Sequence, residues 1–322
     1  MMLDKGGNVN DGLAVDRNYR NVPRQKFDQL ARFRAAHPRR HTLAQGVKWE
    51  YIASGRGAEA LLILPGLLGI GEMSFQHIRA FENDYRVIAP SYPCELATMN
   101  QLADGVAAIL DAEGLQQAHV LGGSYGGMVA QCLVRRCPQR VVSLVLSHTG
   151  GPEPDRAAAN RRFIALLRLL PMGLLRLMLK RATRQTFKDA PEQLPFWEAY
   201  SSEMIARLRK ADLISRYQAA VDFNATSAFT PDDLKDWPGR ILILEGDNDP
   251  VAKAPARAAL KALYPQARVH TFHGSGHAAP IAKLDEYVAV IRRFLWASAS
   301  LQSLQAARTT RRSEGGGLWL MP

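Results

Sequence analysis

The amino-acid sequence predicts an α/β fold in which helices flank a mostly parallel central sheet, and two observations indicate this class. First, from about residue 47, short apolar runs alternate with segments of helical pattern, as in a parallel sheet covered by helices. Second, several of these runs, such as Leu61–Leu64 and Val141–Leu146, are almost continuously apolar. Strands that are buried on both faces have this composition.

The predicted elements follow one another along the chain. The strand-like runs are Lys48–Ala53, Leu61–Leu64, Arg86–Ala89, Ala118–Leu121, Val141–Leu146, Arg240–Leu244 and Arg268–Phe272. Helices are predicted at about 74–82, 99–113, 125–136, 255–264 and 283–296. The alternation stops between about residues 151 and 238, where the pattern is mostly helical, and then resumes. We therefore expect a core of residues 47–150 and 239–297 with a helical cap, residues 151–238, inserted into it.

The two ends of the 322-residue chain carry much of its basic charge. Residues 1–45 hold nine Lys and Arg against four Asp, and the net charge of the chain is +11. Basic termini can bind nucleic acid, but no nucleic-acid-binding motif accompanies these, so no nucleic-acid partner is expected. We interpret residues 1–46 as a basic, partly disordered segment and residues 298–322 as a flexible tail.

Composition and cysteine usage favour a cytoplasmic protein. Hydrophobic residues make up 47% of the chain, enough for a large core, and the first residues show no apolar run typical of a secretory signal. The longest apolar stretch, Phe163–Leu179, is interrupted by Arg168 and Pro171, so it is not expected to span a membrane. The three cysteines fit neither a disulfide framework nor a zinc site and are expected to be buried and reduced. We expect neither a metal nor another cofactor.

The segment with the clearest chemistry is Gly122-x-Ser124-x-Gly126, which lies between the apolar run Ala118–Leu121 and a helical run. So tight a turn forces the serine into a strained backbone conformation and needs glycine neighbours so that strand and helix can approach. The hydroxyl group then lies at the helix N-terminus, where the helix dipole favours negative charge. The pattern predicts that Ser124 is a nucleophile rather than an incidental residue of a glycine-rich turn.

A serine hydroxyl needs a base and an orienting acid to act as a nucleophile. The base is expected from the loop after Arg268–Phe272, at the end of the sheet where such folds place their sites. His277 lies in this Gly/Ser loop, whereas His273 still belongs to the strand end. His277 is therefore the preferred base.

The acid is expected from the loop after Arg240–Leu244, which holds three carboxylates. Asp249 lies deeper in the turn, before Pro250, and is preferred. Asp247 is the alternative, and it could instead be a turn residue that bonds its own backbone. Glu245 is interpreted as structural.

These motifs together resemble the α/β-hydrolase superfamily over about residues 47–297. The resemblance implies the α/β-hydrolase fold and a reaction in which the acyl group passes through a serine ester. By resemblance, Ser124 is the nucleophile, His277 the general base and acid, and Asp249 the orienting carboxylate. The resemblance also implies an oxyanion hole formed by the backbone N–H groups of Leu67 and Tyr125.

Two further runs, Tyr85–Pro93 and Tyr264–Arg268, together with the Gly-x-Ser-x-Gly turn, resemble the maspardin branch of the superfamily. That branch is associated with partner binding, and its charge-relay positions are not all intact. Here Ser124, Asp249 and His277 are all present, which favours activity.

The predicted cap is both basic and apolar. Between Arg156 and Lys188 there are nine Lys and Arg and no acid, interleaved with leucines. Pro171 and Gly173 are expected to divide this stretch into two short helices. One interpretation is a lid whose leucines pack on the core and whose arginines face water. The other is a lid that docks on an anionic membrane or admits a lipid-like acyl chain.

We therefore expect a serine hydrolase, similar to a carboxylesterase or lipase, that cleaves a carboxylic ester or related acyl bond of a largely apolar small molecule. Hydrolysis of a thioester, amide or carbon–carbon bond, or acyl transfer, would use the same triad, and a non-catalytic binding protein is the third alternative. An apolar cap implies an apolar-walled pocket. Candidate lining residues of this pocket are Leu68, His148 and Phe163.

Overall fold

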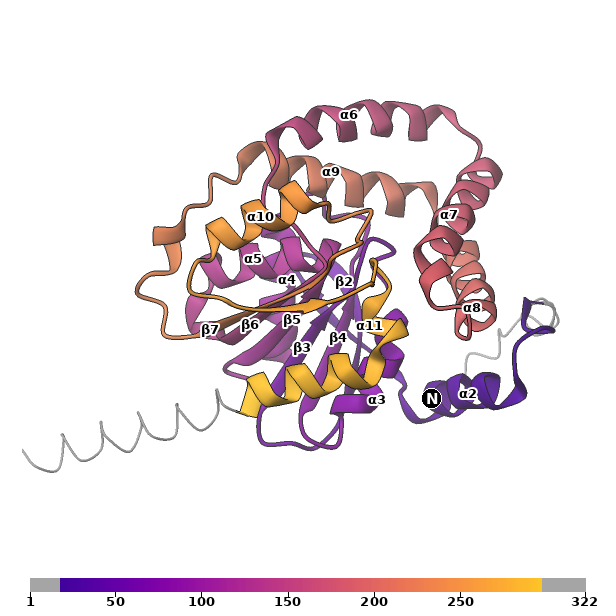
Figure 1. Cartoon of the computed structure of the whole chain (residues 1–322), viewed down its shortest axis with the longest axis horizontal. Coiled ribbons are helices and arrows are strands. Elements are labelled where there is room, and N and C mark those ends of the chain that lie inside the picture. Colours follow the sequence, from indigo (N-terminus) through magenta and orange to yellow (C-terminus); the bar gives the residue numbers. More distant parts are fainter. Residues whose placement is uncertain (1–17, 297–322) are drawn as a thin grey trace, which may run out of the picture.

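The computed structural model describes residues 18–296 of the chain. Its centre is an eight-stranded sheet in the order β1-β2-β4-β3-β5-β6-β7-β8 (Figure 1). β2 pairs antiparallel with β1 and β4, and the remaining neighbours are parallel. The strands are β1 (Arg39–Ala44), β2 (Val47–Ser54), β3 (Ala60–Leu64), β4 (Arg86–Ser91), β5 (Ala118–Gly123), β6 (Val141–Ser147), β7 (Arg240–Gly246) and β8 (Arg268–Phe272).

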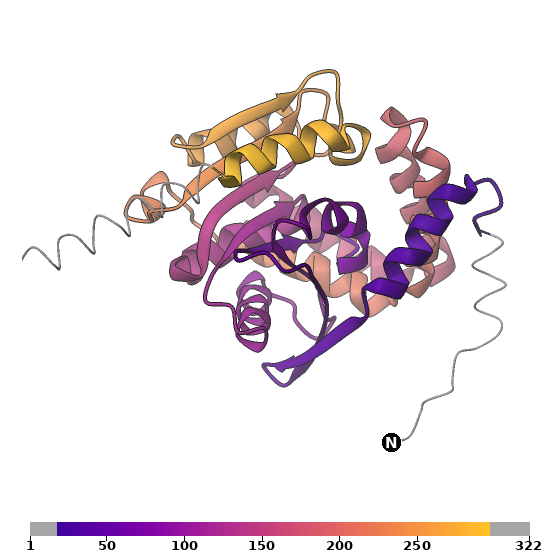
Figure 2. The same ribbon diagram turned by 90° about the horizontal axis from the view of Figure 1, so that it is seen from below.

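Helices cover both faces of the sheet (Figures 1 and 2). The core helices are α2 (Arg24–Ala36), α3 (Phe75–Phe81), α4 (Met99–Ala112), α5 (Tyr125–Arg136), α10 (Ala254–Leu263), the short α11 (Ala279–Ala282) and a helix over residues 284–296. Short 3-10 turns lie at η1 (Gly71–Ser74), η2 (Pro138–Arg140), η3 (Phe187–Asp189) and η4 (Pro231–Leu234). α4, α5 and α10 share a buried cluster with one face, and α3 and residues 284–296 share a cluster with the other.

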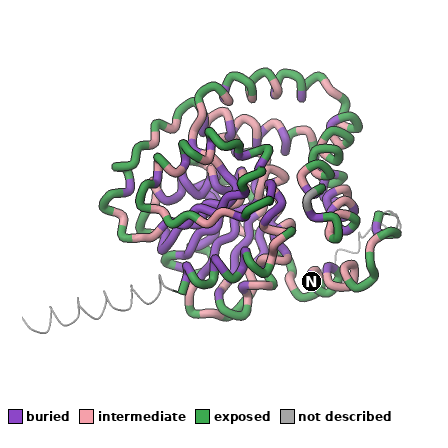
Figure 3. The backbone as a smooth tube through the Cα atoms, viewed as in Figure 1, coloured by how far each residue is buried: buried purple, intermediate pink, exposed green. Residues whose placement is uncertain are grey.

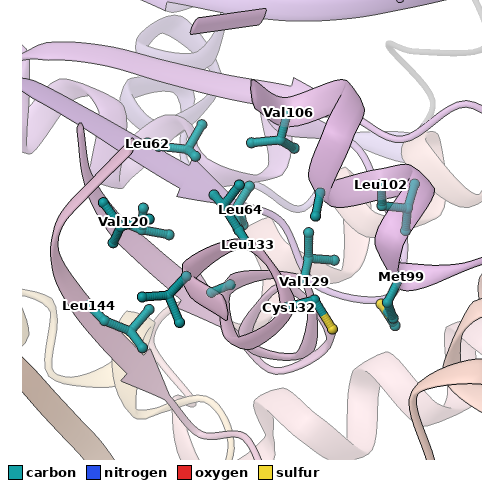
Figure 4. Close-up of a cluster of buried hydrophobic side chains, with 14 of the residues drawn as sticks. Leu62, Leu64, Met99, Leu102, Val106, Val120, Val129, Cys132, Leu133 and Leu144 are labelled. Atoms are coloured by element: carbon teal, nitrogen blue, oxygen red, sulfur yellow. The ribbon is translucent and has the colours of Figure 1, made fainter. Parts of the chain in front are cut away.

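The central strands β3 to β7 form the most buried part of the sheet (Figure 3). All residues of β3 and β6 are buried, as predicted from their continuous apolar composition. On one face Leu62 and Leu64 of β3 and Val120 of β5 lie in the same cluster as Val106 of α4 and Leu133 of α5 (Figure 4). This packing on both sides fixes the strand ends from which the functional loops emerge.

The seven predicted strands are all present, with bounds that differ by at most two residues at either end. Within residues 1–46, interpreted from the sequence as partly disordered, the structure contains two regular elements, α2 and β1. β1 is an edge strand with mostly exposed residues, so its polar sequence carries no apolar run, but it pairs with β2 over six residues. The basic residues 1–17 and the tail 298–322 lie outside the described residues.

Four helices lie between β6 and β7, in the stretch predicted to be a cap. They are α6 (Pro154–Leu169), α7 (Met172–Thr186), α8 (Leu194–Arg207) and α9 (Lys210–Thr226). α6 and α9 run alongside each other over the edge of the core, and α7 and α8 stand beside it (Figure 1). Pro171 separates α6 from α7 as predicted, whereas Gly173 lies within α7.

Two smaller expectations concern cysteines and membranes. The three cysteines are free thiols; Cys132 is buried, but Cys94 and Cys137 are partly exposed, so burial is wrong for these two. None of the helices in residues 18–296 has both the length and the apolar character needed to cross a bilayer.

Candidate active site

Ser124 lies at the sharp turn between β5 and α5, and its backbone is strained. Its φ of 51° and ψ of −116° lie in a region that L-residues rarely adopt. The Ser124 N–H donates to the carbonyl of Ser147 at 2.9 Å, and the Ser124 carbonyl accepts from the hydroxyl of Thr149 at 2.8 Å. A Cβ on Gly126 would lie 2.2 Å from the carbonyl oxygen of Leu64. The turn therefore requires glycine at 126, as the sequence predicts.

Ser124, His277 and Asp249 form a continuous hydrogen-bonded chain. The Nε2 atom of His277 lies 3.1 Å from Oγ of Ser124, and its Nδ1 atom lies 2.8 Å from Oδ2 of Asp249. Because an ionised carboxylate only accepts, Nδ1–H donates to Asp249, which leaves the Nε2 lone pair facing the serine hydroxyl. In this arrangement the imidazole can take the serine proton.

Asp249 is held ionised by its hydrogen bonds. Burial raises the pKa of this carboxyl, but the hydrogen bond from His277 and those from the backbone N–H groups of Val251 and Ala252 outweigh burial, so its pKa lies below the usual value. Both backbone bonds go to Oδ1, at 2.8 and 3.0 Å, and leave Oδ2 for the imidazole.

The rejected candidates lie in the same two loops or at the end of β7. Asp247 lies 3.2 Å from Nδ1 of His273, a mostly exposed histidine, and it accepts from the backbone N–H of Ser275. Glu245, in β7, pairs with Lys261 of α10 at 2.9 Å. The contacts of Asp247 tie the two loops together, and they keep Asp247 away from the chain of hydrogen bonds that ends at Ser124.

The two predicted oxyanion-hole residues lie next to Ser124. Tyr125 is the first residue of α5, where backbone N–H groups have no partner within the helix. Leu67 belongs to the loop after β3, which lines the same cavity as Ser124 and His277. The loop is held by a hydrogen bond from Gly69 to Gly66 and by the Tyr92 hydroxyl, which donates to the carbonyl of Pro65.

A cavity of about 310 Å³ lies between this loop and the cap. Leu68 lines it, as predicted, and the cap contributes Leu179, Ala182 and Thr183 of α7. Phe163 is not among its lining residues; it packs against Tyr217 of α9 with ring centroids 4.8 Å apart. The cap residues of the cavity were missed from the sequence because leucines occur on every side of α7, so their spacing does not indicate which face is turned inward.

His148 lines a second, smaller cavity at Ser124. His148 follows β6 with a φ of 48°, and the cavity, which Ser124 also lines, has a volume of about 30 Å³. Burial, together with the nearby His277, lowers the pKa of His148 to about 3, so the ring is neutral. Its Nδ1 atom lies 3.0 Å from Oγ of Ser147, whereas Nε2 is buried and has no hydrogen-bond partner within residues 18–296. A cavity of this size holds about one water molecule.

Known proteins share this architecture. A model of the alpha/beta hydrolase family matches residues 61–290. The chain is 27% identical to 2-hydroxymuconate semialdehyde hydrolase of Pseudomonas putida over 282 residues, 82% of this chain and 96% of that protein. It is 27% identical to maspardin of Mus musculus over 215 residues, 65% of each chain. A thermophilic esterase from Thermogutta terrifontis has a similar fold, with a TM-score of 0.67 at 20% identity, over 81% of this chain and 98% of that one. Both resemblances predicted from the sequence are confirmed.

Proposed function

The chain belongs to the alpha/beta hydrolase family, and we propose that it is a serine hydrolase that cleaves a carboxylic ester or related acyl bond through an acyl-enzyme. The observation that carries this proposal is the hydrogen-bonded chain from Asp249 through His277 to Ser124, with distances of 2.8 and 3.1 Å. Acyl transfer to serine uses a nucleophilic serine, a histidine that takes its proton and a carboxylate that orients the histidine.

In the first half of the proposed reaction, Oγ of Ser124 attacks the carbonyl carbon of the substrate while Nε2 of His277 takes the hydroxyl proton. The negative charge that forms on the carbonyl oxygen is stabilised by the backbone N–H groups of Leu67 and Tyr125. His277 then gives its proton to the leaving alcohol as the bond between carbon and the leaving oxygen breaks. Asp249 stays ionised and stabilises the imidazolium.

In the second half, a water molecule attacks the acyl-enzyme. His277 takes a proton from this water, the tetrahedral centre collapses, and the proton passes to Oγ of Ser124. The carboxylic acid leaves and the serine hydroxyl is restored. The two halves use the same groups in opposite order, so no further residue is needed for proton transfer.

The cavity supports a largely apolar small-molecule substrate. Its walls are formed mostly by aliphatic side chains, with Leu67 and Leu68 on the core side and Leu179 and Phe187 on the cap side. Its volume of about 310 Å³ lies at the lower end of the range for small-molecule pockets. An acyl chain of moderate length fits this description better than a highly charged substrate does.

Other bonds could be cleaved by the same groups, including thioester, amide and carbon–carbon bonds, and acyl transfer uses the same acyl-enzyme. The similarity to 2-hydroxymuconate semialdehyde hydrolase makes that semialdehyde the second substrate to test. A non-catalytic, maspardin-like binding role is disfavoured, because Ser124, Asp249 and His277 are all present and in hydrogen-bonding positions.

The test is hydrolysis of a series of p-nitrophenyl esters from acetate to decanoate. We expect activity that rises toward medium chain lengths and that falls by at least about 10⁴-fold in Ser124→Ala. Ser202→Ala, a serine of the cap that is not in the triad, serves as the control and should keep its activity. Equal activity of Ser124→Ala and wild type would refute the proposal.

A further inference from the structure

The α6–α7 corner, defined here as residues 161–181, exposes a high concentration of large apolar side chains. Leu169 is 82% exposed and Leu177 is 63% exposed, and Leu166, Leu174 and Met178 are also exposed. These five are among only nine exposed large hydrophobic residues in the part of the chain that the structure describes. The corner lies at the outer edge of the cap (Figures 1 and 3). Exposed apolar patches of this kind mark interaction sites.

The same corner carries cations that have no ion-pair partner in the part of the chain that the structure describes. No side chain within residues 18–296 forms an ion pair with Arg161, Arg162, Arg168, Lys180 or Arg181. The nearest paired cation on α7 is Arg184, which bonds Glu198 at 3.0 Å. Residues 156–188 contain no Asp or Glu, so the surface combines apolar side chains with uncompensated positive charge.

We propose that the α6–α7 corner docks on the surface of an anionic lipid bilayer. Leucines and a methionine flanked by Arg and Lys match the pattern of helices that lie at the membrane interface, with the apolar side chains among the acyl chains and the cations at the headgroups. A second copy of this chain fits the corner poorly, because the same surface would bring two sets of unpaired cations together.

A groove at this surface lies next to the cavity of the candidate active site. A cavity of about 560 Å³ between α7 and α8 is lined by Leu177, Lys180 and Arg181 of the corner, and it shares Thr183 and Ser201 with the cavity that holds Ser124. Ser201 is 1% exposed, and its Oγ has no hydrogen-bond partner among the described residues. Since Thr183 and Ser201 line both cavities, a route from the bilayer to Ser124 would pass the buried hydroxyl group of Ser201. The inference that a substrate reaches Ser124 by this route rests on the proposed function. The inference that the corner docks on a bilayer does not.

Docking is tested by co-sedimentation of the full chain with vesicles of phosphatidylcholine alone and of phosphatidylcholine with 30% phosphatidylserine. We expect binding to the anionic vesicles only. Because each cation near such a surface contributes on the order of 1 kcal/mol, Arg162→Gln/Arg168→Gln/Arg181→Gln should weaken partitioning by on the order of 100-fold. The matched control, Arg56→Gln/Arg79→Gln/Arg293→Gln, removes three exposed cations elsewhere and should bind within about threefold of wild type.

The apolar contribution is tested separately. Leu169→Asp/Leu177→Asp should weaken partitioning by about tenfold or more, whereas Leu43→Asp/Val269→Asp, which changes two exposed apolar residues of β1 and β8, should not. Ser124→Ala should bind as wild type does, which separates docking from catalysis. The proposal is overturned if the wild type does not bind anionic vesicles or if the control variants lose as much binding as the corner variants. It is also overturned if the corner variants abolish a dimer seen by analytical ultracentrifugation while vesicle binding is absent.

Discussion

The imidazole rings of His148 and His277 meet edge to face, with their centroids 6.0 Å apart and their planes at 89°. His148 stays neutral because burial lowers its pKa to about 3. In the proposed reaction His277 becomes positively charged, so a neutral neighbour at this distance adds no repulsion.

Replacement of His148 by a cation should slow the reaction. At 6 Å and an effective dielectric constant of about 20, two positive charges repel by roughly 3 kcal/mol, so His148→Lys should lower kcat/KM by on the order of 100-fold. His148→Gln, which is neutral and polar, should stay within about fivefold of wild type. The measurement is kcat/KM for ester hydrolysis by both variants, with thermal melts to check that they fold. An equal loss of kcat/KM in the two variants would show that charge is not the cause.

The choice between the two aspartates of the β7 loop is tested by a matched pair of variants. Asp249→Asn keeps the size of the side chain but gives His277 the wrong tautomer, so kcat should fall by on the order of 10⁴-fold. Asp247→Asn changes a carboxylate that contacts the mostly exposed His273 and should keep most of the activity. Steady-state kinetics of both variants provide the measurement. The opposite order of effects would assign the acid to Asp247.

The tight turn at Ser124 predicts a difference between two neighbouring glycines. A Cβ at 126 would lie 2.2 Å from the Leu64 carbonyl oxygen, whereas a Cβ at 123 would meet nothing within 4 Å. Gly126→Ala should therefore lower the free energy of unfolding by about 2–3 kcal/mol, and Gly123→Ala by less than about 1 kcal/mol. Urea unfolding followed by circular dichroism measures both; similar losses would contradict the geometry of the turn.

Cavity size predicts how chain-length preference depends on α7. Leu179 lines the cavity beside Ser124, so Leu179→Trp should fill part of it and lower kcat/KM for p-nitrophenyl octanoate by about tenfold or more, with a smaller effect on the acetate. Leu174→Trp places the same ring on an exposed position of the same helix and is the control. A loss that is equal for both esters would place the acyl chain elsewhere.

Stability should fall on acidification, in part through His119. This side chain is fully buried, and burial lowers its pKa to about 4. Between about pH 6.5 and 4 the unfolded chain binds a proton that the native protein does not, so stability is complete above this window and falls by up to about 1 kcal/mol per pH unit within it. His119→Gln should flatten the pH dependence of the free energy of unfolding, measured by urea unfolding between pH 7.5 and 4.5. An unchanged slope would show that His119 does not contribute.

The core of the site could be predicted from sequence because each residue follows a strand that the sequence predicts, and the strands before Ser124 and Asp249 are buried and apolar. Ser124 follows β5, Asp249 follows β7 and His277 follows β8, and parallel strands bring these ends to one edge of the sheet. The tight turn at Ser124 could also be predicted, because glycine at 126 lets β5 and α5 approach each other closely.

The orientation of the cap helices and the presence of the N-terminal elements could not be predicted in the same way. In α7 both the cavity-lining Leu179 and the exposed Leu177 are leucines, so composition does not reveal which face is buried. β1 is polar and exposed, so nothing in its sequence separates it from a loop. Its place in the fold depends on pairing with β2, which is a tertiary contact.

The assignment of Ser124 as the nucleophile is tested most directly by mass spectrometry of the protein after reaction with a fluorophosphonate. We expect one covalent adduct, located on the peptide that contains Ser124, and its loss in both Ser124→Ala and His277→Ala. An adduct on another residue, or labelling that persists in Ser124→Ala, would contradict the assignment of Ser124 as the nucleophile.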